Sequence, residues 1–148
     1  MLNKKICIFG PPCVGKTTLA YTALKNKIPS FTTHDSPFMV DGREVWVNHI
    51  LNLDIPLFLD SGGLNIGWSD NELDDLRDDT KTVLLLPPRD VYLERERMDI
   101  KNRGESKNQN GIQSYDSFMG LKSEFDLVIE DVLSPQEIFD YIIETLEK

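Results

Sequence analysis

Residues 10–17 of the chain read Gly10-Pro-Pro-Cys-Val-Gly15-Lys16-Thr17. The stretch matches the pattern G-x-x-x-x-G-K-[ST] at every fixed position. Glycine near both ends allows backbone torsions that a Cβ resists, so the N–H groups of such a loop can turn inward around an anion. The apolar run Lys5–Phe9 precedes the loop and the helix-compatible run TTLAYTALK follows it. We therefore expect a strand, a phosphate-binding loop and a helix in that order.

The bound anion is expected to be the phosphate tail of a nucleotide. The N-terminus of the following helix adds unpaired N–H donors and the positive end of the helix dipole. Lys16 is expected to reach the β- and γ-phosphates of ATP, and Thr17 to place its hydroxyl on Mg²⁺. The other expected nucleotide-binding residues are Gly10, Pro11, Pro12, Cys13, Val14, Gly15 and Thr18. The alternative is a chance glycine turn before a helix, which the four fixed positions and the flanking runs disfavour.

The rest of the chain alternates between strand-like and helix-like segments. Runs such as LFL and TVLLL are continuously apolar, which is typical of strands buried on both faces of a parallel sheet. The expected strands are Lys5–Phe9, Ser30–Thr33, Pro56–Leu59, Thr82–Leu86 and Phe125–Ile129, and the expected helices are Lys16–Lys25, 70–79, Asp90–Ile100 and a last helix after Ser134. This order predicts a doubly wound α/β fold, with a mainly parallel five-stranded sheet flanked by helices.

The last helix has the clearest start signal in the sequence. Ser134 is an expected N-cap, Pro135 suits the first helical position, and Glu137 stands at the third. Apolar residues then recur at spacings of three and four, which predicts one buried stripe made of Ile138, Tyr141, Ile142 and Leu146.

Length and composition indicate a globular protein and argue against a membrane-spanning or disulfide-rich one. A chain of 148 residues, 40% hydrophobic and 28% charged, suggests a single globular domain. No run approaches the roughly 20 apolar residues that span a bilayer, and the apolar stretch before Gly10 is too short for a signal peptide. Two cysteines, Cys7 and Cys13, make neither a disulfide framework nor a metal set. We therefore expect a cytoplasmic protein without a membrane partner.

With the phosphate loop in place, the chain from Lys4 to Lys148 resembles the small P-loop kinases, which include shikimate and gluconate kinases and the nucleoside monophosphate kinases. The resemblance implies transfer of the γ-phosphate of ATP to a small-molecule acceptor, with Mg²⁺ as the metal. Outside the loop it depends on short motifs: Phe31-Thr-Thr-His34-Asp35, Pro56-Leu-Phe-Leu-Asp60-Ser61-Gly62-Gly63, Glu94-Arg95-Glu96-Arg97 with Arg103, and DLVIEDVLSPQEIFDYI.

Four positions are candidates for holding the acceptor. Asp35 would lie at the carboxyl edge of the sheet if the second strand delivers it there, and could orient or deprotonate a hydroxyl; the alternative is a polar turn. Arg43 could hold an anionic acceptor group or be a surface arginine. Gly62 and Gly63 would let the backbone approach a ligand or only form a turn. The shikimate type usually has Asp-x-Asp where this chain has Thr33-His34-Asp35, so the acceptor stays open between a hydroxyl metabolite and a nucleoside monophosphate.

A second residue that could bind the metal and a lid complete the expected site. Asp60 ends an apolar run and could hold Mg²⁺ through water, or be a turn aspartate. Residues 95–114 are polar and poor in core residues, which predicts a mobile lid. Arg97 and Arg103 are the first candidates for stabilising the transferring phosphate. Arg95 could stack on adenine or pair with a carboxylate of its own helix. Tyr115, Phe118 and Leu121 are expected to return to the core.

Two other functions would also explain a nucleotide site. One is an ATPase or switch that acts with a protein partner, although the chain lacks the Asn/Thr-Lys-x-Asp pattern of GTPases. The other is a kinase of nucleic-acid ends. Sixteen basic against 25 acidic residues give a net charge of −9, which opposes binding to a polyphosphate backbone. The oligomeric state cannot be derived from the sequence.

Overall fold

The computed structural model describes residues 4–11, 14–32, 50, 52–60, 80–103 and 111–146. Within these ranges five strands form one sheet in the order β2-β3-β1-β4-β5, and every strand pair is parallel. The strands are β1 (Lys5–Phe9), β2 (Ser30–Thr32), β3 (Leu57–Asp60), β4 (Thr80–Leu85) and β5 (Leu127–Ile129). The predicted fold class is confirmed, with strand ends shifted by one or two residues.

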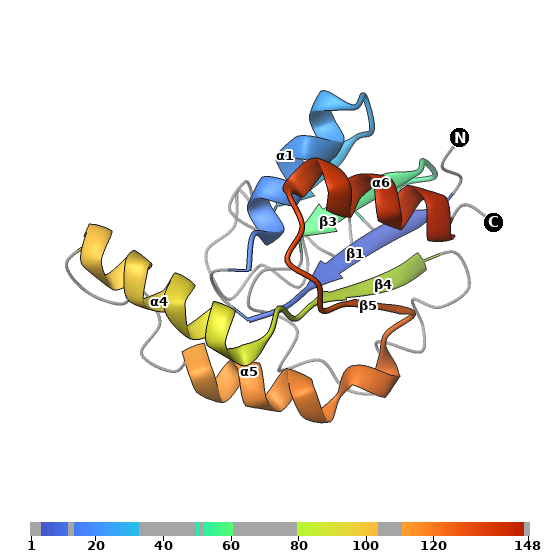
Figure 1. Cartoon of the computed structure of the whole chain (residues 1–148). Helices are drawn as coiled ribbons and strands as arrows, with labels where there is room; N and C mark the ends of the chain where they lie inside the picture. The colour runs from blue at the N-terminus through green and yellow to red at the C-terminus, as the bar shows by residue number, and fades with distance from the viewer. Residues whose placement is uncertain are drawn as a thin grey trace.

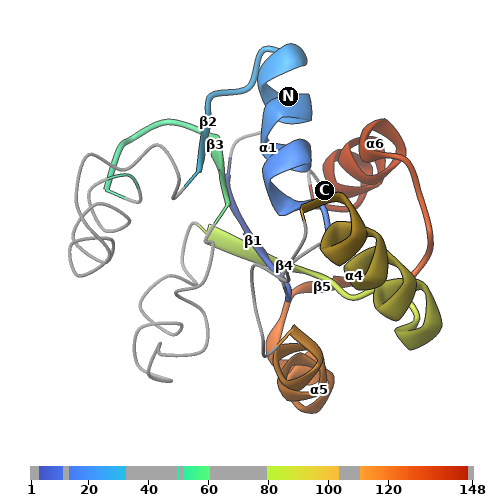
Figure 2. The same cartoon turned by 90° about the vertical axis from the view of Figure 1, so that its left-hand side faces the viewer.

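Helices lie on both faces of the sheet (Figures 1 and 2). Helices α1 and α6 lie together on one face and α5 lies on the other, while α4 projects from the end of β4. The described helices are α1 (Lys16–Lys25), α4 (Arg89–Arg103), α5 (Gly111–Gly120), the short 3-10 helix η4 (Lys122–Glu124) and α6 (Pro135–Leu146). The predicted helix at 70–79 lies outside the described residues.

The central strands are apolar because both of their faces are covered. Every residue of β1 and β3 is buried, and aromatic rings pack against both strands. The ring centroids of Phe58 and Phe139 of α6 lie 5.6 Å apart, and those of Phe9 and Phe125, which follows η4, lie 5.3 Å apart. Such burial of large apolar side chains is the main favourable term in folding. The sheet therefore gives a rigid support for the loops at its carboxyl edge.

Helix α6 begins where the sequence predicts. The Ser134 N–H donates to Glu137 Oε1 at 3.0 Å, and the Glu137 N–H donates to Ser134 Oγ at 3.2 Å, which is a complete capping box. The predicted stripe is only partly correct, because Tyr141 is 46% exposed. Phe139 takes its place, so the buried residues of the helix are Phe139, Ile142 and Leu146.

Helix α5 was not expected from the sequence, which is polar up to residue 113. Two aromatic residues hold it, since Tyr115 is 3% and Phe118 is 2% exposed. Leu121, which we expected in the core, is 43% exposed because it follows the end of the helix. The expectation for Leu121 is therefore wrong, and the return to the core is made by Tyr115, Phe118 and Phe125.

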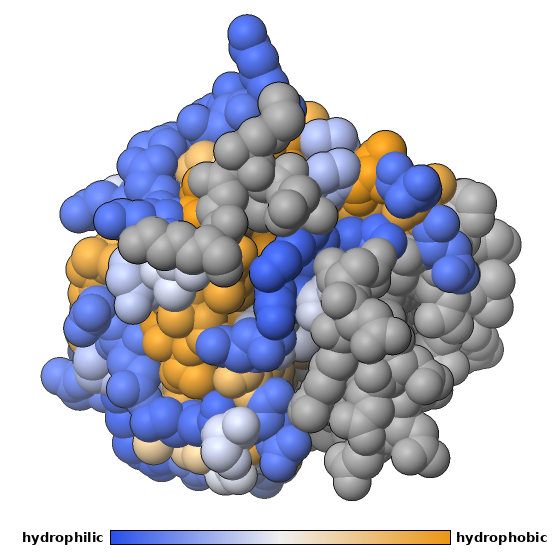
Figure 3. All heavy atoms as spheres, turned by 90° about the vertical axis from the view of Figure 1, so that its right-hand side faces the viewer, coloured by the Kyte–Doolittle hydropathy of each residue, from blue (hydrophilic) through white to orange (hydrophobic). Residues whose placement is uncertain are grey.

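The outer surface is mixed in character. Figure 3 shows the face on the right of Figure 1, where apolar patches are framed by hydrophilic side chains. Among the described residues, we find no helix with the length and apolar character that a bilayer crossing requires.

Candidate nucleotide-binding site

The loop after β1 is shaped by a glycine that no other residue can replace without a collision. Gly10 has φ of +157°, and a Cβ at this position would lie 2.8 Å from the carbonyl oxygen of Leu85 and 2.8 Å from Val14 Cγ2. Real Cβ contacts are not this short, so the backbone would have to move. The absence of a side chain at Gly10 thus lets the loop pass directly against the end of β4.

Gly15 turns the chain into α1. It is the N-cap of the helix, with φ of 93° and ψ of 23°, a left-handed conformation that favours glycine. Among the described residues no side chain caps the helix, and its first turn contains no acidic residue. The N–H groups and positive dipole end of α1 are therefore not neutralised by a carboxylate of the helix. This is the electrostatic condition for binding an anion.

Lys16 lies back across the loop. Its Nζ donates hydrogen bonds to the carbonyl oxygens of Gly10 at 2.5 Å and Pro11 at 3.0 Å. The side chain is half-buried, so the ammonium group is held at the mouth of the loop instead of extending into solvent. A phosphate bound in the loop would offer charged oxygens, which are stronger acceptors for an ammonium than backbone carbonyls. Thr18, next in the helix, is exposed.

Thr17 and Asp60 meet although 43 residues separate them. The Thr17 hydroxyl donates to Asp60 Oδ2 at 2.8 Å. Asp60 is the last residue of β3, is fully buried, and stands in register with Ile8 of β1 and Thr32 of β2. Parallel pairing therefore brings the carboxylate to the carboxyl edge of the sheet, beside the first turn of α1.

This pair has the chemistry that Mg²⁺ requires. Mg²⁺ prefers oxygen ligands and in nucleotide sites uses one or two protein groups, completed by phosphates and water. A hydroxyl and a buried carboxylate at 2.8 Å meet that requirement. Within the described ranges no group of three or more His, Cys, Asp and Glu side chains gathers into a metal cage. Thr17 and Asp60 are the described residues that would hold the ion.

Three arginine side chains of α4 are described, and two of them, Arg95 and Arg97, have different surroundings. Arg95 is half-buried, on the side of the helix that also carries the buried Tyr92. Arg97 is exposed, and its Nη2 donates to Glu94 Oε1 of the same helix at 2.6 Å. That hydrogen bond and the charge of Glu94 raise the pKa of the Arg97 guanidinium. Arg103 is the last residue of α4, so the first nine residues of the expected lid are helical.

Two polar residues with buried atoms, Glu96 and Thr32, were not singled out by the sequence motifs. One carboxylate oxygen of Glu96 is buried and has no hydrogen-bond partner among the described residues. Thr32, at the end of β2, is 1% exposed. Neither lies in a recognisable pattern, so only the tertiary structure reveals their burial. The candidate residues Pro12, Cys13, Asp35, Arg43, Gly62 and Gly63 lie outside the described residues, as does the side chain of Arg103.

Comparison with known proteins identifies relatives by structure only. No protein-family model matches the sequence, and no curated protein is detectably similar to it in sequence. A shikimate kinase from Aquifex aeolicus has a TM-score of 0.69 at 18% identity, covering 97% of this chain and 96% of that chain. A gluconokinase from Sinorhizobium meliloti has a TM-score of 0.65 at 15% identity, covering 99% and 93%.

A third solved structure was determined with a ligand. The YorR protein of Bacillus subtilis, in complex with phosphorylated GDP, has a TM-score of 0.67 at 17% identity, covering 97% of this chain and 95% of that chain. Because the likeness to all three extends over nearly the full length of both chains, this chain has the fold of the small P-loop kinases.

Proposed function

We propose that this protein is an ATP- and Mg²⁺-dependent phosphotransferase that acts on a small-molecule acceptor. The observation that carries the proposal is the hydrogen bond of 2.8 Å between Thr17 and Asp60, next to the glycine-capped N-terminus of α1. A metal-binding pair beside an anion-binding helix end matches a triphosphate with its magnesium ion. The fold shared with solved small-molecule kinases supports a phosphoryl transfer.

The residues of the loop would act mainly by binding and orienting. The N–H groups of the loop and of the first turn of α1 would hold the phosphates, while Lys16 exchanges its bonds to Gly10 and Pro11 for phosphate oxygens. Thr17 and Asp60 would hold Mg²⁺, which, when bound, neutralises charge on the β- and γ-phosphates. Phosphoryl transfer requires little covalent chemistry from the protein, so positioning and charge stabilisation suffice.

The acceptor side of the site stays a proposal based on sequence. Asp35 would orient the acceptor, Arg43 with Gly62 and Gly63 would bind it, and an arginine of α4 or the following segment would stabilise the developing charge. The solved neighbours include kinases named for shikimate and gluconate, and a protein that holds a phosphorylated nucleotide. Hydroxyl metabolites and nucleoside monophosphates are therefore the two acceptor classes to test.

An acceptor screen tests the proposal. ADP release from Mg·ATP would be measured with hydroxylated metabolites and with all ribo- and deoxynucleoside monophosphates. We expect one class to stimulate release, and the Lys16→Ala variant to lose the stimulation. Release that no acceptor changes, but that Lys16→Ala abolishes, would replace the kinase with an ATPase or switch. Absence of release under every condition would contradict the proposal.

A further inference from the structure

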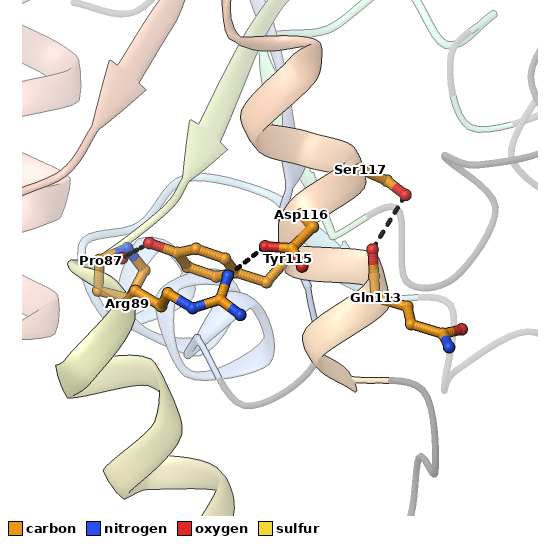
Figure 4. Close-up of polar contacts among 6 residues, drawn as sticks. All are labelled: Pro87, Arg89, Gln113, Tyr115, Asp116 and Ser117. Atoms are coloured by element: carbon orange, nitrogen blue, oxygen red, sulfur yellow. Dashed lines mark hydrogen bonds and ion pairs between the residues drawn. The ribbon is translucent and has the colours of Figure 1, made fainter.

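Three contacts join the base of α4 to α5, and Figure 4 shows the two polar ones. The Tyr115 hydroxyl of α5 donates to the Pro87 carbonyl oxygen at 2.6 Å. The Tyr115 ring also stacks on Tyr92 of α4, with ring centroids 4.9 Å apart and planes 26° apart. Beside them, Arg89 Nη1 forms an ion pair with Asp116 Oδ1. Each contact joins residues more than 20 positions apart, so together they fix the two helices against each other.

The tyrosine pair is the buried part of this junction. Tyr92 is fully buried and Tyr115 is 3% exposed, and burial raises the pKa of the Tyr115 hydroxyl, which therefore stays a neutral donor around pH 7. The ion pair is exposed on both sides, with 54% and 55% of the side chains accessible, so water screens it. We expect the tyrosine contacts to dominate and the ion pair to contribute weakly.

The acceptor of the hydrogen bond lies next to the nucleotide loop. Pro87 is in the short connection between the end of β4 at Leu85 and the start of α4 at Arg89. The Leu85 carbonyl oxygen is the atom that a Cβ on Gly10 would strike at 2.8 Å. The connection that Tyr115 contacts therefore borders the phosphate loop on one side and begins the arginine-bearing helix on the other.

We propose that Tyr115 is a positioning residue for phosphoryl transfer, because it holds the base of α4 through Pro87 and Tyr92 and thereby fixes the direction of the helix that carries Arg97 and Arg103. This inference rests on the proposed kinase function. Tyr115 acts through Tyr92 and Pro87, the two residues that it contacts at the base of α4. The ion pair between Arg89 and Asp116 is the exposed contact of the same junction.

Removing only the hydroxyl group of Tyr115 tests whether this residue positions α4 for phosphoryl transfer. In Tyr115→Phe we expect kcat to fall about fivefold, because a factor of about five is the rate ratio equivalent to the net free energy of one hydrogen bond. KM for ATP should stay within about twofold of the wild-type value. Tyr141→Phe, which removes an exposed hydroxyl from α6, is the matched control and should change neither constant. A fall in thermal stability with unchanged kcat would make Tyr115 a structural residue only and overturn the inference.

Charge exchange tests the second contact independently. Arg89→Asp and Asp116→Arg should each lower kcat by about twofold at low salt, and the double exchange should restore it, since it recreates the pair with reversed charges. A double variant that is no better than the single variants would show that the ion pair is not part of the junction.

Hydrogen exchange separates this inference from the kinase proposal. In the nucleotide-free protein, Tyr115→Phe should speed amide exchange in the first turn of α4 and in α5 and leave α1 and α6 unchanged. If the wild-type protein transfers no phosphate while this exchange pattern appears, the proposed function is wrong and the contact is real. Exchange identical to wild type would overturn the junction itself.

Discussion

Gly10 tolerates no side chain because the loop passes too close to the end of β4. In Gly10→Ala the new methyl group would meet the Leu85 carbonyl oxygen at 2.8 Å, and the φ of +157° would add backbone strain. We expect a loss of about 1–3 kcal/mol in the free energy of unfolding, measured by urea titration. Gly120→Ala is the control, since a Cβ there meets nothing within 4 Å. Equal stability of the two variants would contradict the geometry of the loop.

Asp60 is proposed to bring negative charge to Mg²⁺, and that charge can be removed with little change in the shape of the side chain. Asp60→Asn keeps the shape and can still accept the hydrogen bond from Thr17, but it removes the negative charge. We expect the Mg²⁺ concentration at half-maximal activity to rise about 10- to 100-fold.

A second contact between an aspartate and a threonine, in which the threonine is buried and the aspartate is exposed, provides the control for Asp60. Asp126 accepts hydrogen bonds from the Thr82 N–H at 2.8 Å and the Thr82 hydroxyl at 3.2 Å. Asp126→Asn should lower stability and leave the Mg²⁺ dependence unchanged. If both variants showed the same Mg²⁺ dependence as wild type, Asp60 would have no role with the metal.

Residue patterns predicted the strand before the loop and the helix after it, whereas the roles of the loop residues with a nucleotide stay predictions. The glycine, lysine and threonine of the loop are fixed by local backbone geometry, so four positions in sequence were sufficient to locate them. The contact between Thr17 and Asp60 was not predicted, although each was a candidate for the metal, and it arises because the strand ends meet at one sheet edge. The burial of Glu96 and the bond from Tyr115 to Pro87 depend on how distant helices pack, and no local pattern encodes that.

At the scale of elements, the capping box of α6 makes a pH-dependent prediction. Hydrogen bonds from the backbone N–H and then the hydroxyl of Ser134 lower the pKa of Glu137 from its usual 4.5. A lowered folded-state pKa means that this contribution to stability is complete above pH 4.5 and is lost as the pH falls through the folded-state value. We expect Glu137→Gln to lose less stability than wild type between pH 7 and about pH 3.

Two comparisons make the capping test specific. Ser134→Ala removes the other half of the box and should cost about 1 kcal/mol at pH 7. Glu144→Gln, an exposed carboxylate of the same helix, should leave the acid sensitivity of wild type unchanged. If Glu137→Gln and Glu144→Gln gave identical pH profiles in urea unfolding, the pKa shift of Glu137 would have no consequence for stability.

Helix start signals and apolar runs predicted most of the helices and strands, but they did not predict α5. Helix α6 has a serine cap and α1 follows a fixed motif, and both begin where expected. The segment before Tyr115 is polar, so composition indicated a loop. A helix of ten residues there is stabilised by burying Tyr115 and Phe118 against other elements, which is a tertiary effect. The position of Tyr141 was misjudged because Phe139 has the better access to the sheet.

At the scale of the whole molecule, strand order decides where the site lies. Strand β1 is central, between β3 and β4, so the loop after Phe9 receives Asp60 from one neighbour and the Leu85 carbonyl from the other. The alternation of strands and helices predicted the fold class. The strand order was not deduced from the sequence, because pairing of distant segments leaves no local signal. The three solved structures share this fold at 15–18% identity, so the fold is retained although most of the residues differ.

Calorimetric titration with a non-hydrolysable ATP analogue and Mg²⁺ tests most directly whether the loop at residues 10–17 binds a triphosphate. The account predicts one site in the wild-type protein, an affinity about 10- to 100-fold lower in Lys16→Ala, and wild-type affinity in Lys25→Ala, which removes an exposed lysine from the far end of α1. No binding by the wild-type protein, or equal binding by Lys16→Ala, would contradict it.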